Sequence, residues 1–273
     1  MIADASNETR RSIAAAILSH NPSLQVIEAV DGETAAARIV ADKPDVLFVN
    51  VKLPGMSGAE AVAIARSRGA RPVTILISDQ VLTRWVALST EVDAYEFLKS
   101  PYDPAHVVAL MRAIDMMRKP LRVQIVVDAE NTRAVIRKML AGTRFNLNIE
   151  ETNSGAHAIK LLQHTHFDLS LIDLNLAGMD GLETACKAKE IAPETALVML
   201  SGAGNERIEA TFKHFGFSTF LQKPFLAHHV EDMLHEVYDL RRPYLLNAIG
   251  RVHKRHIAKA EADAEKRGRK RVA

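Results

Sequence analysis

The most restrictive feature of this sequence is a long internal repeat. The stretch "LFVNVKLPGMSG", which ends at Gly58, returns in similar form as "LIDLNLAGMDG", which ends at Gly181, 123 residues later. The same shift aligns further pairs, namely Gly32 with Gly155, Asp45 with Asp168, Ser78 with Ser201 and Pro101 with Pro224. A match of this extent predicts two copies of one domain, residues 1–119 and 120–241, followed by a tail, residues 242–273. Pro120 ends the helix expected before the second copy.

Each copy alternates short apolar runs with helical patterns. In the second copy, the runs of strand length are "VQIVV", "NLNIEE", "DLSLID", "ALVMLS" and "TFLQ". Between them, apolar residues recur every three or four positions in "TRAVIRKML", "AHAIKLL", "GLETACKAKEI" and "ERIEATFKHF". Five strands alternating with five helices predict an α/β fold with an open, doubly wound parallel sheet in each copy. Ligands of such sheets bind at the carboxyl ends of the strands.

Four chemically useful side chains stand at those strand ends in the second copy: Asp128, Asp173, Ser201 and Lys223. Two carboxylates suit Mg²⁺, which prefers oxygen ligands and keeps several waters. A carboxylate also attacks a phosphoryl group to form an acyl phosphate, while a lysine, a hydroxyl and a metal hold the phosphoryl oxygens. The residues therefore predict a pocket that accepts phosphate.

Both copies resemble the receiver domains of two-component response regulators, over about residues 1 to 240. The resemblance is carried by "DLSLIDLNLAGMDG", by the serine after "LVML" and by "FLQKP". Asp173 and Ser201 are 28 residues apart, and Ser201 and Lys223 are 22 apart, in the order and spacing of that family. The resemblance implies two flavodoxin-like (βα)5 receiver domains in tandem and a cofactor, Mg²⁺.

The resemblance also implies roles for individual residues. Asp173 corresponds to the phosphoacceptor, Ser201 to the hydroxyl that follows the phosphoryl group, and Lys223 to the cation that contacts phosphate. Phe220 corresponds to an aromatic switch residue that acts with Ser201, and Pro224 to a proline after a cis peptide bond. The implied phosphodonor is a histidine kinase or a phosphotransfer protein, and the implied output is binding to a downstream protein.

The acidic loop of the second copy departs from the family pattern. Receivers usually carry two adjacent acids after the first strand, whereas this copy has Ala129 beside Asp128 and then Glu130. Asp128 therefore fits either acidic position. Two ligand sets stay open for Mg²⁺: Asp128 and Asp173 with a backbone carbonyl near Asn175, or the same carboxylates with Glu130 added.

The first copy departs further. Asn50 stands at the acceptor position and Ser100 at the lysine position, with Lys99 displaced by one residue. Asp4 remains from the acidic pair and is followed by alanine. Asparagine is a poor nucleophile and brings no charge to a metal, so this copy is expected to be a degenerate pseudo-receiver with a short first strand.

The tail differs from the body in charge. It carries +7, so that the remaining body carries −5 at the overall charge of +2. We expect a partly apolar helix followed by a basic end. The tail lacks a helix-turn-helix pattern, so binding to nucleic acid is not favoured. No apolar run reaches the roughly 20 residues needed to span a bilayer, and we expect a cytoplasmic protein.

Two classes of function follow. The preferred one is a signalling module that is phosphorylated on Asp173 and acts through protein–protein contacts, including a homodimer formed through Tyr95 and the helix from Pro104 to Met117. The alternative is a phosphorylation-independent scaffold in which both copies are docking platforms. An enzyme is not expected, apart from slow self-dephosphorylation of the acceptor.

Overall fold

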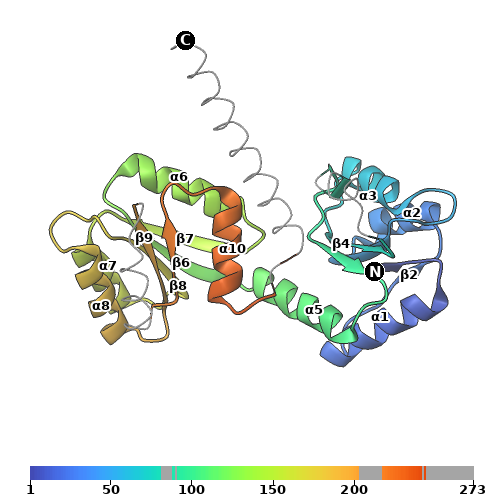
Figure 1. Cartoon of the computed structure of the whole chain (residues 1–273), viewed down its shortest axis with the longest axis horizontal. Helices are drawn as coiled ribbons and strands as arrows, with labels where there is room; N and C mark the ends of the chain where they lie inside the picture. Colours follow the sequence, from blue (N-terminus) through green and yellow to red (C-terminus); the bar gives the residue numbers. More distant parts are fainter. Residues whose placement is uncertain (81–87, 90, 203–216, 242, 244–273) are drawn as a thin grey trace, which may run out of the picture. The chain divides into compact units, whose positions relative to one another are not determined.

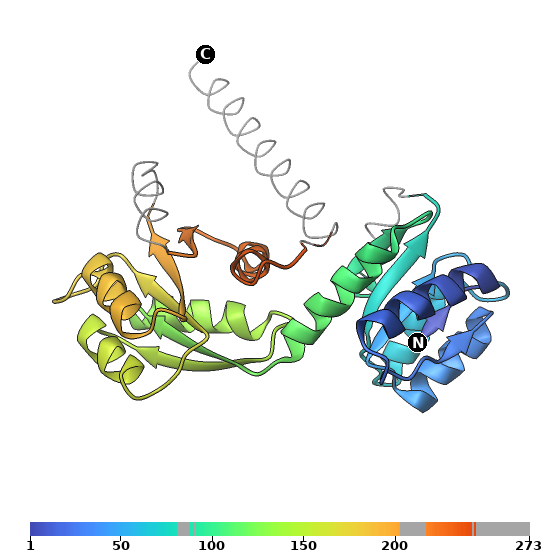
Figure 2. The same ribbon diagram turned by 90° about the horizontal axis from the view of Figure 1, so that it is seen from below.

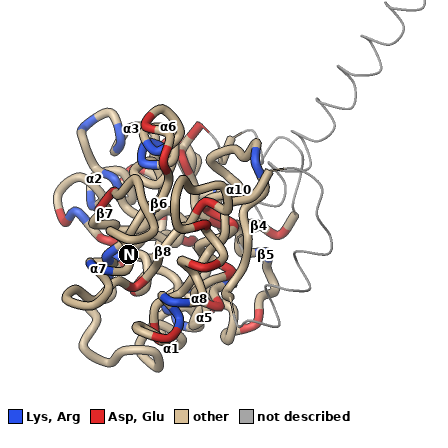
Figure 3. The backbone as a smooth tube through the Cα atoms, turned by 90° about the vertical axis from the view of Figure 1, so that its left-hand side faces the viewer, with Lys and Arg blue, Asp and Glu red and all other residues tan. Residues whose placement is uncertain are grey.

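The structure is a computed structural model that describes residues 1–80, 88–89, 91–202, 217–241 and 243. The described residues form two compact units, 1–112 and 113–241. The helix expected over 206–215 and the helix expected in the tail lie outside the described residues. Residues of both charge signs are interspersed along the described chain (Figure 3).

The first unit has a five-stranded sheet with the order β2-β1-β3-β4-β5, in which every adjacent pair is parallel. Its elements are β1 (Ile2–Ala3), α1 (Asn7–His20), β2 (Glu28–Ala29), α2 (Gly32–Asp42), β3 (Val46–Asn50), α3 (Gly58–Ser67), β4 (Val73–Ser78), β5 (Glu96–Lys99) and the first part of α5 (Pro104–Arg118), a helix that continues into the second unit. Helices α2 and α3 lie side by side (Figure 1).

The second unit repeats this arrangement, with the order β7-β6-β8-β9-β10. Its elements are β6 (Leu121–Val126), α6 (Glu130–Ala141), β7 (Leu147–Thr152), α7 (Gly155–Leu162), β8 (Leu169–Asp173), α8 (Gly181–Ile191), β9 (Ala196–Ser201), β10 (Thr219–Gln222) and α10 (Ala227–Val237). Helix α7 lies beside α8, and α6 lies beside α10, with the sheet between the two pairs (Figures 1 and 2). The doubly wound parallel sheet predicted from the alternation of strands and helices, and the flavodoxin-like fold implied by the resemblance, are confirmed.

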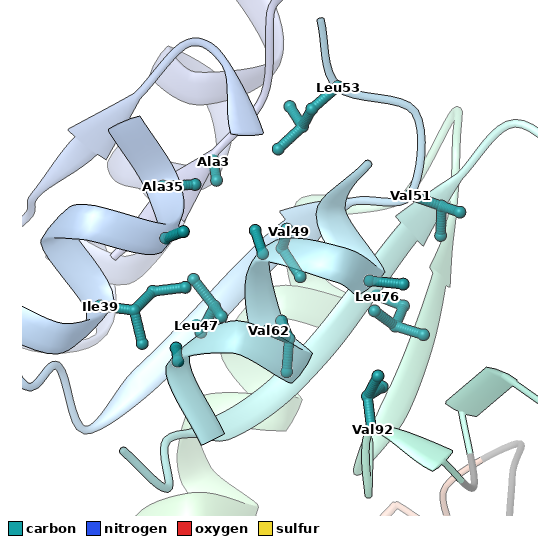
Figure 4. Packing of buried hydrophobic residues seen from close by; sticks show 14 of the residues in the cluster. Ala3, Ala35, Ile39, Leu47, Val49, Val51, Leu53, Val62, Leu76 and Val92 are labelled. Atoms are coloured by element: carbon teal, nitrogen blue, oxygen red, sulfur yellow. The ribbon is translucent and has the colours of Figure 1, made fainter. Parts of the chain in front are cut away.

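The central strands β3, β4, β8 and β9 are mostly apolar because helices cover both faces of each sheet. In the first unit, Leu47 and Val49 of β3 point toward Ile39 of α2 and Val62 of α3 (Figure 4). Several helices are preceded by an N-cap residue whose side chain accepts a hydrogen bond from the N–H of the third helical residue. This bond satisfies a donor that has no partner within the helix. The N-cap residues are Asp31, Ser57, Ser154 and Asp180.

The units differ most in their first strands. Strand β1 has two residues, whereas β6 has six and pairs with β7 along its whole length. The first unit has a cavity of about 330 Å³ that Met1, Val26 and Val46 help to line. The short first strand expected from the sequence is therefore present.

Candidate functional site

The central residue of the candidate site is Asp173, the last residue of β8. Strand β8 lies between β6 and β9, so the carboxyl end of β8 opens toward the ends of both neighbours. Asp173 is only 4% exposed. Its Oδ2 accepts a hydrogen bond from the Lys223 ammonium, and its Oδ1 accepts one from the backbone N–H of Asn175 at 3.2 Å. A nearly buried carboxylate is thus paired with a cation from another strand end.

Lys223 and Ser201 lie at the ends of the next two strands. Ser201 ends β9, and Lys223 directly follows β10; the Lys223 N–H donates to the Ser201 carbonyl at 2.7 Å. The Ser201 hydroxyl donates to the carbonyl of Gly202 at 3.1 Å. The peptide bond between Lys223 and Pro224 is cis, as the resemblance implied. Three of the four predicted residues therefore converge on one edge of the sheet.

A close approach of two chain segments requires glycine next to the acceptor. Gly181, the first residue of α8, donates its N–H to the Leu174 carbonyl at 3.1 Å. A Cβ at position 181 would lie 2.0 Å from the carbonyl oxygen of Asp173. The acceptor loop is therefore packed directly against the start of α8.

The strand register settles which acidic position Asp128 fills. In the first unit, Ala3 pairs with Val49, so Asp4 lies opposite Asn50. In the second unit, Val126 pairs with Ile172, so the residue opposite Asp173 is the buried Val127. Asp128 is one residue farther along, at the second acidic position, and it is exposed. No carboxylate occupies the first acidic position of this unit.

Glu130 is the first residue of α6 and is exposed. Among the described residues there is no group of three or more His, Cys, Asp or Glu side chains that could hold a metal ion. Asp128, Glu130 and Asp173 therefore do not form a three-carboxylate cluster. Mg²⁺ is commonly bound through one or two carboxylates and otherwise by water, so Asp128 and Asp173 still fit it by ligand type.

Phe220, the predicted switch residue, lies on β10 two residues before Gln222. Its half-buried ring packs partly against the core of the second unit. It also lines a surface cavity of about 370 Å³ together with Lys223, His229 and Met233. The residue thus connects the neighbourhood of the site with the surface beside α10.

The equivalent site of the first unit is closed by its own side chains. The Asn50 amide Nδ2 donates to Asp4 Oδ2 at 2.9 Å, and Asn50 Oδ1 accepts the N–H of Lys52 at 2.9 Å. Asp4 Oδ1 accepts the N–H of Ser6 at 2.8 Å. The register pairs Ser78 with Lys99, which leaves Ser100 equivalent to Lys223. The Asn50 amide therefore forms a hydrogen bond with the Asp4 carboxylate, the group that a metal would otherwise bind.

Tyr95, which the sequence associates with a dimer face, belongs to the core of the first unit. Its side chain is only 2% exposed, because the residue immediately precedes β5 and packs into the first unit. The homodimer expected to involve Tyr95 and the helix from Pro104 to Met117 stays a prediction, in which Tyr95 would act from the core of the unit.

An arginine–glutamate pair in each unit was missed in the sequence. Arg133 of α6 lies 3.5 Å from Glu151 at the end of β7, and Arg10 of α1 lies 2.7 Å from Glu28. Both pairs follow the 123-residue shift, which was the available signal.

The family model for the response regulator receiver domain matches residues 1–112 and again residues 123–235. The chain belongs to the response regulator receiver family. Among curated relatives, 85 residues are 34% identical to the autoinducer 1 sensor kinase/phosphatase LuxN of Vibrio campbellii, covering 31% of this chain and 10% of that protein. The chain thus spans about a tenth of the length of LuxN. The chemotaxis protein CheY of Bacillus subtilis is 27% identical over 115 residues, covering 42% of this chain and 95% of CheY.

Two solved structures share the tandem arrangement. Both are described as two-component system response regulator/GGDEF domain proteins, and both are 19% identical to this chain. Each alignment covers 87% of this chain and 96% of the other, with TM-scores of 0.63 and 0.64. At this identity the likeness concerns the fold, and it agrees with two receiver domains in tandem. The described residues contain no helix that is long and apolar enough to span a membrane.

Proposed function

We propose that this protein is a two-component response regulator whose second unit is phosphorylated on Asp173 by a histidine kinase or a phosphotransfer protein. The observation that carries the proposal is the nearly buried Asp173 carboxylate, which is bonded to the Lys223 ammonium and stands one strand away from the Ser201 hydroxyl. A cytoplasmic location, where such kinases meet ATP, belongs to the same proposal.

The transfer is a displacement at phosphorus. One oxygen of Asp173 forms a bond to the phosphorus atom of phosphohistidine, the bond from phosphorus to the imidazole nitrogen breaks, and the imidazole leaves and takes up a proton. Charge gathers on the phosphoryl oxygens, which Lys223 and the Ser201 hydroxyl are placed to contact. The acyl phosphate then stands in place of the Asp173 carboxylate, next to the Lys223 ammonium that already contacts this side chain.

Mg²⁺ is part of the proposal as the resident cofactor. Asp128, Asp173 and the backbone carbonyl of Asn175 would hold it, while Glu130 at the start of α6 would contribute at most through water. When bound, the ion neutralises negative charge between the carboxylates and the incoming phosphoryl group.

The output of the second unit is proposed to run through Ser201 and Phe220. A phosphoryl group on Asp173 attracts the Ser201 hydroxyl away from the Gly202 carbonyl, and the ring of Phe220 adjusts beside it. That ring lines the cavity next to α10, so a downstream protein that binds there would distinguish the two states. Coupling of this kind is typically worth about 1–3 kcal/mol.

The first unit is proposed to be a pseudo-receiver that works by docking. This second function is favoured by the hydrogen bond between Asn50 and Asp4, which satisfies the site without metal or phosphate. We also propose that the receivers span residues 1–119 and 120–241 and that residues 242–273 are a separate tail. The scaffold alternative extends this phosphorylation-independent role to both units.

Labelling with a small phosphodonor tests the proposal. The full chain is incubated with Mg²⁺ and acetyl phosphate, and intact-mass spectrometry measures the gain of one phosphoryl group. Asp173→Asn is expected to abolish the gain, whereas the matched change Asn50→Ala in the first unit is expected to leave it unchanged. Labelling that persists in Asp173→Asn would contradict the assignment, and absence of labelling in the unchanged protein would favour the scaffold alternative.

A further inference from the structure

The loop that carries Asp128 is held by one arginine side chain. Arg133 Nη1 donates to the carbonyl oxygens of Val127 and Asp128, at 2.7 and 2.9 Å. Its Nε lies 3.5 Å from Glu151 Oε2, and Arg137 lies 3.3 Å from Glu151 Oε1. The Arg133 side chain is only 16% exposed. A single guanidinium group therefore joins the end of β6 to the end of β7.

The first unit contains the same clamp. Arg10 Nη1 donates to the carbonyl oxygens of Asp4 and Ala5 at 2.9 and 3.2 Å, while its Nε is 2.7 Å from Glu28. The clamp is thus present in both units, although only the second has an acceptor aspartate. This duplication supplies a matched control for any test of what the clamp does.

The two acidic side chains differ in how they are held. In the first unit, Asp4 is buried, and its carboxylate is fixed by the N–H of Ser6 and the amide of Asn50. In the second unit, Asp128 is exposed. Within the described residues, its carboxylate accepts a hydrogen bond only from the N–H of Ala129, at 2.6 Å. The position of Asp128 therefore depends on its main chain, which Arg133 binds.

We infer that Arg133, anchored by Glu151, is a positioning residue for Mg²⁺: it holds the main chain of Asp128 at the carboxyl end of β6, beside Asp173 on β8. The inference rests on the proposed function. Nη1 binds the two consecutive carbonyl groups while Nε faces Glu151, and the single nitrogen of a lysine ammonium does not reproduce contacts made by two nitrogens of one rigid plane. Residues that orient metal ligands typically change metal affinity by about 10- to 100-fold when they are lost.

Two substitutions separate the effect of the Arg133 charge on Mg²⁺ binding from its effect on the position of Asp128. Arg133→Lys keeps the positive charge and removes the fork. Arg133→Gln removes the positive charge, which by itself favours binding of a cation, so weaker Mg²⁺ binding in this variant reports lost positioning. Both variants are expected to raise the Mg²⁺ dissociation constant by about tenfold.

The experiment uses the full chain and Mg²⁺ alone, with binding measured by isothermal titration calorimetry and folding checked by thermal denaturation. Arg10→Lys is the control: it removes the equivalent clamp of the first unit and is expected to leave Mg²⁺ affinity unchanged. In parallel, labelling by acetyl phosphate is measured against Mg²⁺ concentration. The Arg133 variants should need about tenfold more Mg²⁺ for half-maximal labelling and approach the unchanged protein at saturation.

The inference is overturned if both folded Arg133 variants bind Mg²⁺ as tightly as the unchanged protein or more tightly. It is also overturned if Arg10→Lys weakens binding equally, because the effect would then be general loss of structure. Failure of the unchanged protein to bind Mg²⁺ or to be labelled would instead contradict the proposed function, so the two failures are distinguishable.

Discussion

Replacing Gly181 by alanine is expected to destabilise the second unit and to displace the acceptor loop. A Cβ at this position would lie 2.0 Å from the Asp173 carbonyl oxygen, 2.6 Å from the Leu174 Cα and 2.8 Å from the Asp173 carbonyl carbon. All three atoms belong to the backbone, so no side-chain rotation relieves the contact. Either α8 or the loop after β8 has to move.

The size of the effect follows from two opposing terms. Forcing an extra carbon into a packed site costs about 1–3 kcal/mol. Alanine gains at most about 1 kcal/mol over glycine inside a helix and less at its first residue. With a gain of roughly 0.5 kcal/mol at this position, we expect a net loss of about 0.5–2.5 kcal/mol in the free energy of unfolding. Gly142→Ala is the mild control, because its new Cβ would lie 3.4 Å from its nearest neighbours, the carbonyl oxygens of Lys138 and Met139, and we expect a change within about 0.5 kcal/mol.

The assay combines urea denaturation with labelling of the acceptor, and hydrogen exchange followed by mass spectrometry assigns the destabilisation to one unit. Gly58→Ala is the matched variant, since its Cβ would lie 2.1 Å from the Asn50 carbonyl oxygen. Both crowded variants should lose stability, but only the change at Gly181 should slow labelling of Asp173. Equal urea midpoints for Gly181→Ala and Gly142→Ala would refute the reasoning.

Three further outcomes are expected. Asn50→Asp places a second carboxylate against Asp4, so the first unit should unfold at lower urea concentration, recover when acid protonates the pair, and gain no phosphoryl label by mass spectrometry. Lys223→Met removes a cation that competes with the metal, so calorimetry should show several-fold tighter Mg²⁺ binding while labelling becomes slower. The N–H of Thr34 holds the pKa of Asp31 below its ordinary value. The ionised Asp31 carboxylate therefore stabilises the folded state above the unfolded-state pKa, and this stabilisation is lost as pH falls through the lower folded-state pKa. Asp31→Ala should thus reduce the free energy of unfolding at neutral pH and have no effect in acid.

The fold was predictable because the repeat and the strand pattern constrain each other. Five apolar runs in the order of a parallel sheet leave few topologies, and "ALVMLS" and "TFLQ" match β9 and β10 residue for residue. The convergence of Asp173 and Ser201 followed from the rule that parallel strand ends share one edge. The direct bond between Asp173 and Lys223 did not follow from spacing, because a long lysine side chain reaches many positions.

The acidic loop was the hardest part to predict, because a one-residue difference in its length allows two alignments. The register resolves it by placing Val127, a buried apolar residue, where the first unit has Asp4. Tyr95 illustrates a related limit: an aromatic residue before a strand is compatible with the surface or the core, and only the packing shows that this one is buried.

Comparison of the two units separates what the fold requires from what the chemistry requires. Both keep the arginine clamp and the glycine against the acceptor loop, including Gly58 beside Asn50, although one site has lost its nucleophile. These features therefore belong to the shared architecture of the strand ends, and in the second unit the clamp also binds the main chain of Asp128. The units differ in how the residue at the acceptor position is satisfied: Asn50 is neutral and bonds to Asp4, whereas Asp173 carries a nearly buried charge that needs Lys223. A buried carboxylate with one cationic partner is costly to maintain, and the proposed acceptance of a metal and a phosphoryl group would explain its presence in only one unit.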